Sequence, residues 1–153
     1  MIPRVITSAT AARVLEFLER AGPAPYDALL AALGLRPFRL AKALKHLRGA
    51  GAAYPVRLSV RGEVVEFWRP RDSPRFDPAR AEALAWFAAR LEEAGGRYEN
   101  GRALFPSGQA LPVDVDACPE GIAVVNGDKP GKCLAWCYLR DLKTRRLEKC
   151  LRS

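Results

Sequence analysis

Apolar residues recur at helical spacing in three stretches of the first 50 residues, and glycine or proline residues separate these stretches. The pattern predicts three helices with clear start and stop signals: Ser8 or Thr10 to Ala21, Pro25 or Tyr26 to Gly34, and Pro37 to Gly49. In the third helix Leu40, Leu44 and Leu47 share one face, which we expect to be buried.

After residue 55 the apolar residues recur at every second position instead of at helical spacing. Val56 to Val60 alternates, Arg61-Gly62 has the composition of a turn, and Val64 to Trp68 returns as a second strand. The sequence therefore predicts a hairpin with a short basic tip.

The second half begins with the polar connector 71–76, and the sequence then predicts a helix with Asp77 as its cap and Pro78 in its first turn. Leu84, Phe87, Ala88 and Leu91 form the inner stripe of this helix, and Trp86 lies off the stripe. The helix at 78–94 is therefore predicted either to bury a second surface, against the domain or in a homodimer, or to be a one-sided core helix.

Short apolar or alternating runs follow this helix and indicate strands at 102–105, 111–117, 121–125 and 133–139. We expect the loop 126–131 to close a hairpin between the last two strands, and a basic helix to run from Asp141 to about Arg152. The predicted fold class is α+β. Residues 1–70 form one unit, and residues 71–153 contain a connector, a helix and a small antiparallel β-region.

Charge adds the first functional information. The chain has 25 Lys and Arg against 17 Asp and Glu, and most of the excess lies in residues 1–70, with 11 basic and 5 acidic residues. Such a basic half points to a phosphate-rich partner, nucleic acid first. The alternative is that the charge only favours solubility.

Residues 8–69 resemble the winged helix-turn-helix family. The similar segments are Leu29-Leu30-Ala31-Ala32-Leu33-Gly34-Leu35, Phe38 to Leu47, and Gly51-Ala52-Ala53 before the hairpin, with Leu30 at a position where the family often has Ala. The resemblance implies a transcriptional regulator whose third helix enters the major groove of double-stranded DNA. The chain is also similar in style to small winged-helix proteins of archaea and their viruses.

The residues expected to contact DNA are the cationic residues of the third helix and the hairpin: Arg36, Arg39, Lys42, Lys45, His46, Arg48, Arg57 and Arg61. Arg39, Lys42 and His46 are spaced to form one stripe, and no acidic residue lies between Arg36 and Arg61. The alternatives are an ordinary solvated helix face and a winged helix that binds another protein.

The sequence patterns that would indicate catalysis are weaker than those that indicate DNA binding. His46 is the only histidine, which excludes a His-rich metal site. One pattern is similar to the active site of PD-(D/E)xK nucleases, in which two carboxylates bind Mg²⁺ and a lysine assists: Asp116, Asp141 and Lys143. Two observations count against this pattern. No proline precedes Asp116 directly, and Asp141 can serve as an N-cap. We therefore expect no enzyme and no cofactor, with the Mg²⁺-dependent nuclease as the alternative.

The four cysteines, Cys118, Cys133, Cys137 and Cys150, lack paired zinc-binding knuckles, so we expect buried thiols or a disulfide rather than a metal site. No apolar run is long enough to cross a membrane, and the first residues lack the pattern of a secretory signal. The expected location is cytoplasmic, or the host cell interior if the protein is viral.

Overall fold

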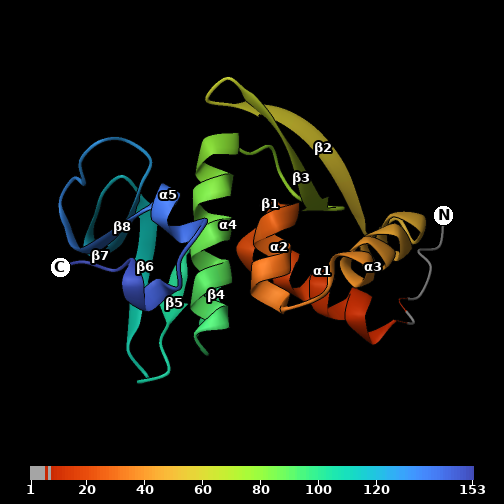
Figure 1. The fold of residues 1–153 in the computed structure, drawn as a ribbon, viewed down its shortest axis with the longest axis horizontal. Helices are drawn as coiled ribbons and strands as arrows, with labels where there is room; N and C mark the ends of the chain where they lie inside the picture. The colour runs from red at the N-terminus through yellow and green to blue at the C-terminus, as the bar shows by residue number, and fades with distance from the viewer. Residues whose placement is uncertain (1–5, 7) are drawn as a thin grey trace.

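The fold is mixed α+β, as a computed structural model that describes residue 6 and residues 8–153 shows (Figure 1). The first half contains α1 (Ala9–Ala21), β1 (Ala24–Pro25), α2 (Tyr26–Leu33), α3 (Pro37–Gly49), β2 (Ala53–Val60) and β3 (Glu63–Pro70). The second half contains α4 (Pro78–Glu93), β4 (Arg97–Glu99), β5 (Arg102–Leu104), β6 (Ala110–Val115), β7 (Cys118–Val125), β8 (Cys133–Tyr138), α5 (Leu139–Leu142) and the 3₁₀ turn η1 (Leu147–Lys149).

The first three helices begin and end at the predicted signals. Ser8 caps α1 because its Oγ accepts a hydrogen bond from the Ala11 N–H at 3.2 Å. Gly34 ends α2 in the left-handed conformation, with φ 62°, which glycine adopts without steric cost. Pro37 occupies the first turn of α3, where its missing N–H is not needed. The three helical predictions are confirmed.

β2 and β3 form the predicted hairpin, and a third short strand joins them. The turn residues Arg61 and Gly62 have φ values of 50° and 82°, the two positive values of a type I′ turn. β1 pairs antiparallel with β3, so the sheet order is β1-β3-β2. β1 is only two residues long and was not predicted from the sequence.

α4 lies between the elements of the first half and the C-terminal sheet, and it is buried on several sides (Figure 1). Its buried residues include Phe87 and Leu91 from the predicted stripe and also Ala83 and Trp86, which lie off it. One cluster of buried side chains extends from α1 through α4 to β7 and α5. The chain itself therefore covers the second surface of α4, and this helix presents no free apolar flank to a second copy in the part of the chain that the structure describes.

The C-terminal sheet is mixed, so the prediction of a small antiparallel region was wrong. Its order is β4-β5-β6-β7-β8, with antiparallel pairing from β4 to β6 and parallel pairing from β6 to β8. The loop 126–131 therefore does not close a hairpin, because β7 and β8 run in the same direction. The loop instead crosses back to the start of β8, where Lys132 accepts a backbone hydrogen bond from Cys118.

The predicted helix from Asp141 to Arg152 was also wrong. Only one turn, α5, and the short η1 form there. Two backbone hydrogen bonds between Trp136 and Arg152, at 2.8 and 2.9 Å, hold the end of the chain beside β8. This bridge and the burial of Leu147 and Cys150 outweigh the helical pattern of the segment.

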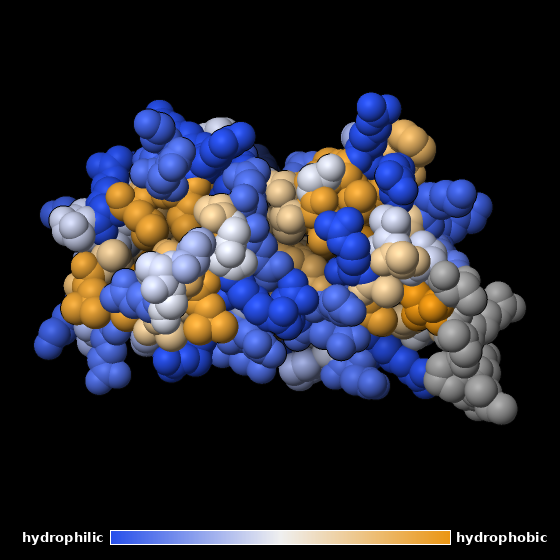
Figure 2. Space-filling view, turned by 90° about the horizontal axis from the view of Figure 1, so that it is seen from below, coloured by the Kyte–Doolittle hydropathy of each residue, from blue (hydrophilic) through white to orange (hydrophobic). Residues whose placement is uncertain are grey.

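The surface that faces downward in Figure 1 is mostly hydrophilic (Figure 2). Hydrophobic residues form separate patches on both halves, and hydrophilic residues interrupt them. Across residue 6 and residues 8–153, the helices are too short or too polar to cross a lipid bilayer.

Candidate nucleic-acid interface

The position of α3 is fixed by its apolar side and by its start. Leu40, Leu44 and Leu47 are buried, as their spacing predicts. At the start of the helix the Tyr26 hydroxyl donates a hydrogen bond to the Pro37 carbonyl oxygen at 2.9 Å. This bond ties the beginning of α2 to the beginning of α3, so the two helices have a fixed relation across the Gly34 turn.

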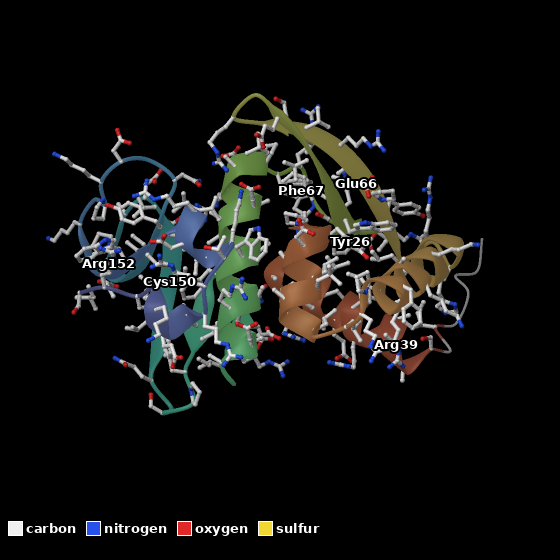
Figure 3. All side chains as sticks on the ribbon, viewed as in Figure 1. Tyr26, Arg39, Glu66, Phe67, Cys150 and Arg152 are labelled. Carbon is white, nitrogen blue, oxygen red and sulfur yellow. The ribbon has the colours of Figure 1, made fainter. Side chains whose placement is uncertain are left out.

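The opposite side of α3 is cationic and exposed to solvent. The exposed cations are Arg36, the N-cap residue just before α3, and Arg39, Lys42, Lys45 and Arg48 within the helix. Within the described part of the chain none of these five has a carboxylate in ion-pairing distance. Arg39 lies at the end of the molecule opposite Cys150 and Arg152 (Figure 3). The surface is therefore open, and its charge is not neutralised by neighbours.

One aromatic side chain interrupts this cationic surface. Phe38, in the first turn of α3, is 67% exposed. A large apolar group at this exposure loses the stabilisation that burial would give it, about 1.5–3 kcal/mol for a phenylalanine. Phe38 was not among the predicted site residues, although its place between Pro37 and Arg39, off the leucine face, was a usable signal.

The predicted stripe of Arg39, Lys42 and His46 is present as the lining of one surface hollow. The hollow has a volume of about 260 Å³, and Ser8 and Thr10 at the start of α1 also line it. His46 is half-buried, and its Nε2 atom is covered and has no hydrogen-bond partner among the described residues. His46 is thus less accessible than the two cations beside it.

Arg57 on β2 is largely free to contact a partner. It faces Glu66 across the β2–β3 ladder, with Nε 3.5 Å from the Glu66 carboxylate, and its side chain is 77% exposed. An ion pair at this exposure contributes about 0–1 kcal/mol. Arg57 can therefore exchange this carboxylate for another anion at little cost.

Arg61 at the hairpin tip is differently placed. Its Nη2 donates to Glu82 of α4 at 2.5 Å, and its Nη1 donates to Asn126 Oδ1 at 3.2 Å. The hairpin tip is thus attached to the C-terminal half instead of being open on all sides. Sequence reasoning missed Glu82, although it is the one acidic residue within the apolar run from Ala81 to Ala89.

The three residues of the nuclease alternative contact different partners. Asp116 Oδ1 accepts hydrogen bonds from the backbone N–H groups of Asn126 and Gly127. Lys143 Nζ lies 3.3 Å from Glu82, and Asp141 lies 3.9 Å from Arg152. The described residues include no group of three His, Cys, Asp or Glu side chains that could hold a metal ion.

The cysteines are free thiols, and three of the four are buried. Burial raises the pKa of Cys137 to about 12, and the neighbouring Cys150 and Asp141 add to the effect. Burial likewise raises the pKa of Tyr98 to about 12, although Arg80 nearby opposes the shift. These groups stay protonated at neutral pH, so the thiols act as apolar core atoms.

No protein-family model, no curated protein sequence and no solved structure matches the chain.

Proposed function

We propose that this protein binds double-stranded DNA through a winged helix and acts as a transcriptional regulator. α3 is the helix that enters the major groove, and the β2–β3 hairpin is the wing. In this arrangement Arg36, Arg39, Lys42 and His46 face bases or the nearest phosphates, while Lys45, Arg48 and Arg57 contact the backbone. Arg61 is left out of this set because its hydrogen bonds to Glu82 and Asn126 hold its side chain against the C-terminal half, away from the cations of α3.

The observation that carries the proposal is the open cationic side of α3. Its five exposed cations have no carboxylate partner in the described residues, although the chain has 17 acidic residues. A face that only needs to be solvated usually mixes both signs of charge, because unpaired like charges on one helix repel. An uncompensated cationic helix face is suited to a phosphate-rich partner.

The order of the elements also supports the proposal. A helix, a short strand, two helices joined by a glycine turn and a hairpin follow one another, and β1 pairs with the second hairpin strand. The burial of Leu40, Leu44 and Leu47 directs the basic residues of α3 outward. These features are those expected of a helix presented to a DNA groove.

The charge count sets the expected salt dependence. If the five cations of α3 and Arg57 each neutralise one phosphate, the slope of log affinity against log salt is about −5. Affinity then falls roughly a thousandfold between about 50 and 200 mM salt.

The test is the affinity of wild type and of the double variant Arg39→Ala/Lys42→Ala for a fluorescent mixed-sequence duplex, measured by anisotropy over a salt series. We expect the double variant to bind at least tenfold more weakly at low salt and the slope to become shallower by about 2. Arg75→Ala/Arg102→Ala is the matched control, because it removes the same charge from exposed positions outside α3. Equal losses in both double variants would show that only net charge matters and would refute the proposed interface.

A further inference from the structure

A second cationic hollow lies next to Arg61 at the hairpin tip, where the parallel strands β7 and β8 end. It has a volume of about 310 Å³ and is bounded by Val125 and Tyr138, the last residues of β7 and β8. In open sheets with parallel strands, ligands bind outside the carboxyl ends of those strands, where the loops diverge. The position of the hollow is therefore one that favours a ligand.

The lining of this hollow is cationic. Arg61, Arg140 and Lys143 contribute three positive charges, Thr144 adds a hydroxyl, and no acidic residue belongs to the lining. Two carboxylates lie next to the lining. The buried carboxylate of Glu82 contacts Arg61 and Lys143, and Asp116 accepts hydrogen bonds from the backbone N–H groups of Asn126 and Gly127. Three cations against two carboxylates still leave a net positive charge at the hollow.

The three cations are held in place before any ligand arrives. Glu82 and Asn126 orient Arg61, Glu82 also holds Lys143, and the Arg140 guanidinium lies 4.3 Å from the centre of the Tyr138 ring. A guanidinium has five N–H donors and an ammonium three, so these contacts leave further donors on each side chain. Side chains that are already ordered lose less entropy when a ligand binds.

From this arrangement we infer that the hollow at the carboxyl ends of β7 and β8 binds a phosphate group through Arg61, Arg140 and Lys143. A phosphate group supplies negative charge that the cationic lining lacks, and its oxygens match the paired donors of guanidinium groups. The hollow is large enough for a small phosphorylated molecule, and a backbone phosphate of a nucleic acid has the same chemistry. The inference does not depend on the proposed function of α3.

The experiment titrates the full chain with inorganic pyrophosphate, without DNA, and follows binding by calorimetry and by the thermal unfolding midpoint. Potassium chloride at matched ionic strength is the salt control. Arg140→Ala is the main variant because Arg140 is exposed and outside the Glu82 contacts, and Arg102→Ala on β5 is the charge-matched control. Thr144→Ala is a second variant with no change of charge.

We expect saturable binding of pyrophosphate to wild type and to Arg102→Ala. Arg140→Ala should bind at least tenfold more weakly, as is typical when one charge-assisted contact is lost, and Thr144→Ala a few-fold more weakly. Midpoints that rise no more with pyrophosphate than with potassium chloride, or affinities that are equal in all four proteins, would overturn the inference.

A parallel measurement of duplex affinity identifies the source of the phosphate. If Arg140→Ala weakens duplex and pyrophosphate binding together, the hollow holds a backbone phosphate of DNA. If duplex affinity is unchanged while pyrophosphate binding is lost, the ligand is a small phosphorylated molecule. Failure of duplex binding in wild type would contradict the proposed function alone, because the pyrophosphate titration contains no DNA.

Discussion

Glu82 gives the sharpest test of how the hairpin is attached to the rest of the molecule. This carboxylate is 3% exposed and has two cationic partners, Arg61 at 2.5 Å and Lys143 at 3.3 Å. We consider the single variants Arg61→Ala and Lys143→Ala and the double variant that carries both. Each single variant leaves the buried carboxylate with one cation, and the double variant leaves it with none.

The magnitudes follow from the burial of each partner. A hydrogen bond to a charged group contributes about 1.5–3 kcal/mol. The Arg61 and Lys143 side chains are 46% and 37% exposed, so solvent screening lowers these values. We expect a loss of about 1–2 kcal/mol for Arg61→Ala and about 1 kcal/mol for Lys143→Ala. The double variant should lose about 3–5 kcal/mol, more than the sum, because an unpaired buried charge remains.

The assay is urea unfolding at pH 7 for wild type, the two single variants and the double variant, analysed as a double-mutant cycle. Adding Glu82→Met to the double variant should restore most of the lost stability, because the uncompensated charge is then gone. The view that Glu82 holds both Arg61 and Lys143 would be refuted by either of two results. The losses of stability in the two single variants could add up to that of the double variant, or the triple variant could be no more stable than the double variant.

Two further predictions concern packing and pH. Gly121→Ala should destabilise the protein by about 3 kcal/mol or more in urea unfolding, because the added Cβ would lie 2.0 Å from the Pro112 carbonyl oxygen. Gly127→Ala, whose Cβ would meet nothing within 4 Å, should change stability little, and similar losses at both positions would contradict the packing. Because the pKa of Cys137 is raised to about 12, its thiol stays protonated in the folded state while the unfolded thiol ionises from about pH 9. Stability should therefore fall as pH rises above about 9, and Cys137→Ala should show a shallower fall than wild type in a urea series up to pH 10.5.

Local signals predicted the first half of the fold well. Ser8, Gly34 and Pro37 act through contacts within a few residues, so caps and turns can be recognised without knowledge of distant partners. The same holds for the hairpin, whose turn at Arg61-Gly62 lies between two segments of period two. The leucine face of α3 also fixed which side of that helix is exposed, and with it most of the candidate interface.

Long-range pairing explains what the sequence did not reveal. β1 exists only because Ala24 and Pro25 pair with Trp68 and Phe67, more than 40 residues away. The direction of β8 relative to β7 is likewise a property of the assembled sheet, and a short polar loop with glycine residues suits a hairpin equally well. The tail beyond Asp141 leaves its helical pattern because bonding to Trp136 satisfies the edge of β8.

The same distinction between local and long-range contacts applies to the candidate sites. The open cations of α3 could be predicted because the helical period alone separates them from the leucines. The engagement of Arg61 could not, since Glu82 and Asn126 approach it from other parts of the chain. The hollow beside β7 and β8 depends on the parallel direction of those strands, which the sequence analysis predicted wrongly.

The shared core has a consequence for protein engineering. α2 packs against α4, and buried side chains continue from there into β7 and α5. A fragment that ends at Pro70 would lack α4, so the apolar residues of α2 that pack against α4 would be exposed to water. A chimaera that joins residues 8–70 to another protein should therefore include α4, with the side of α4 that faces the C-terminal sheet redesigned for the new neighbour.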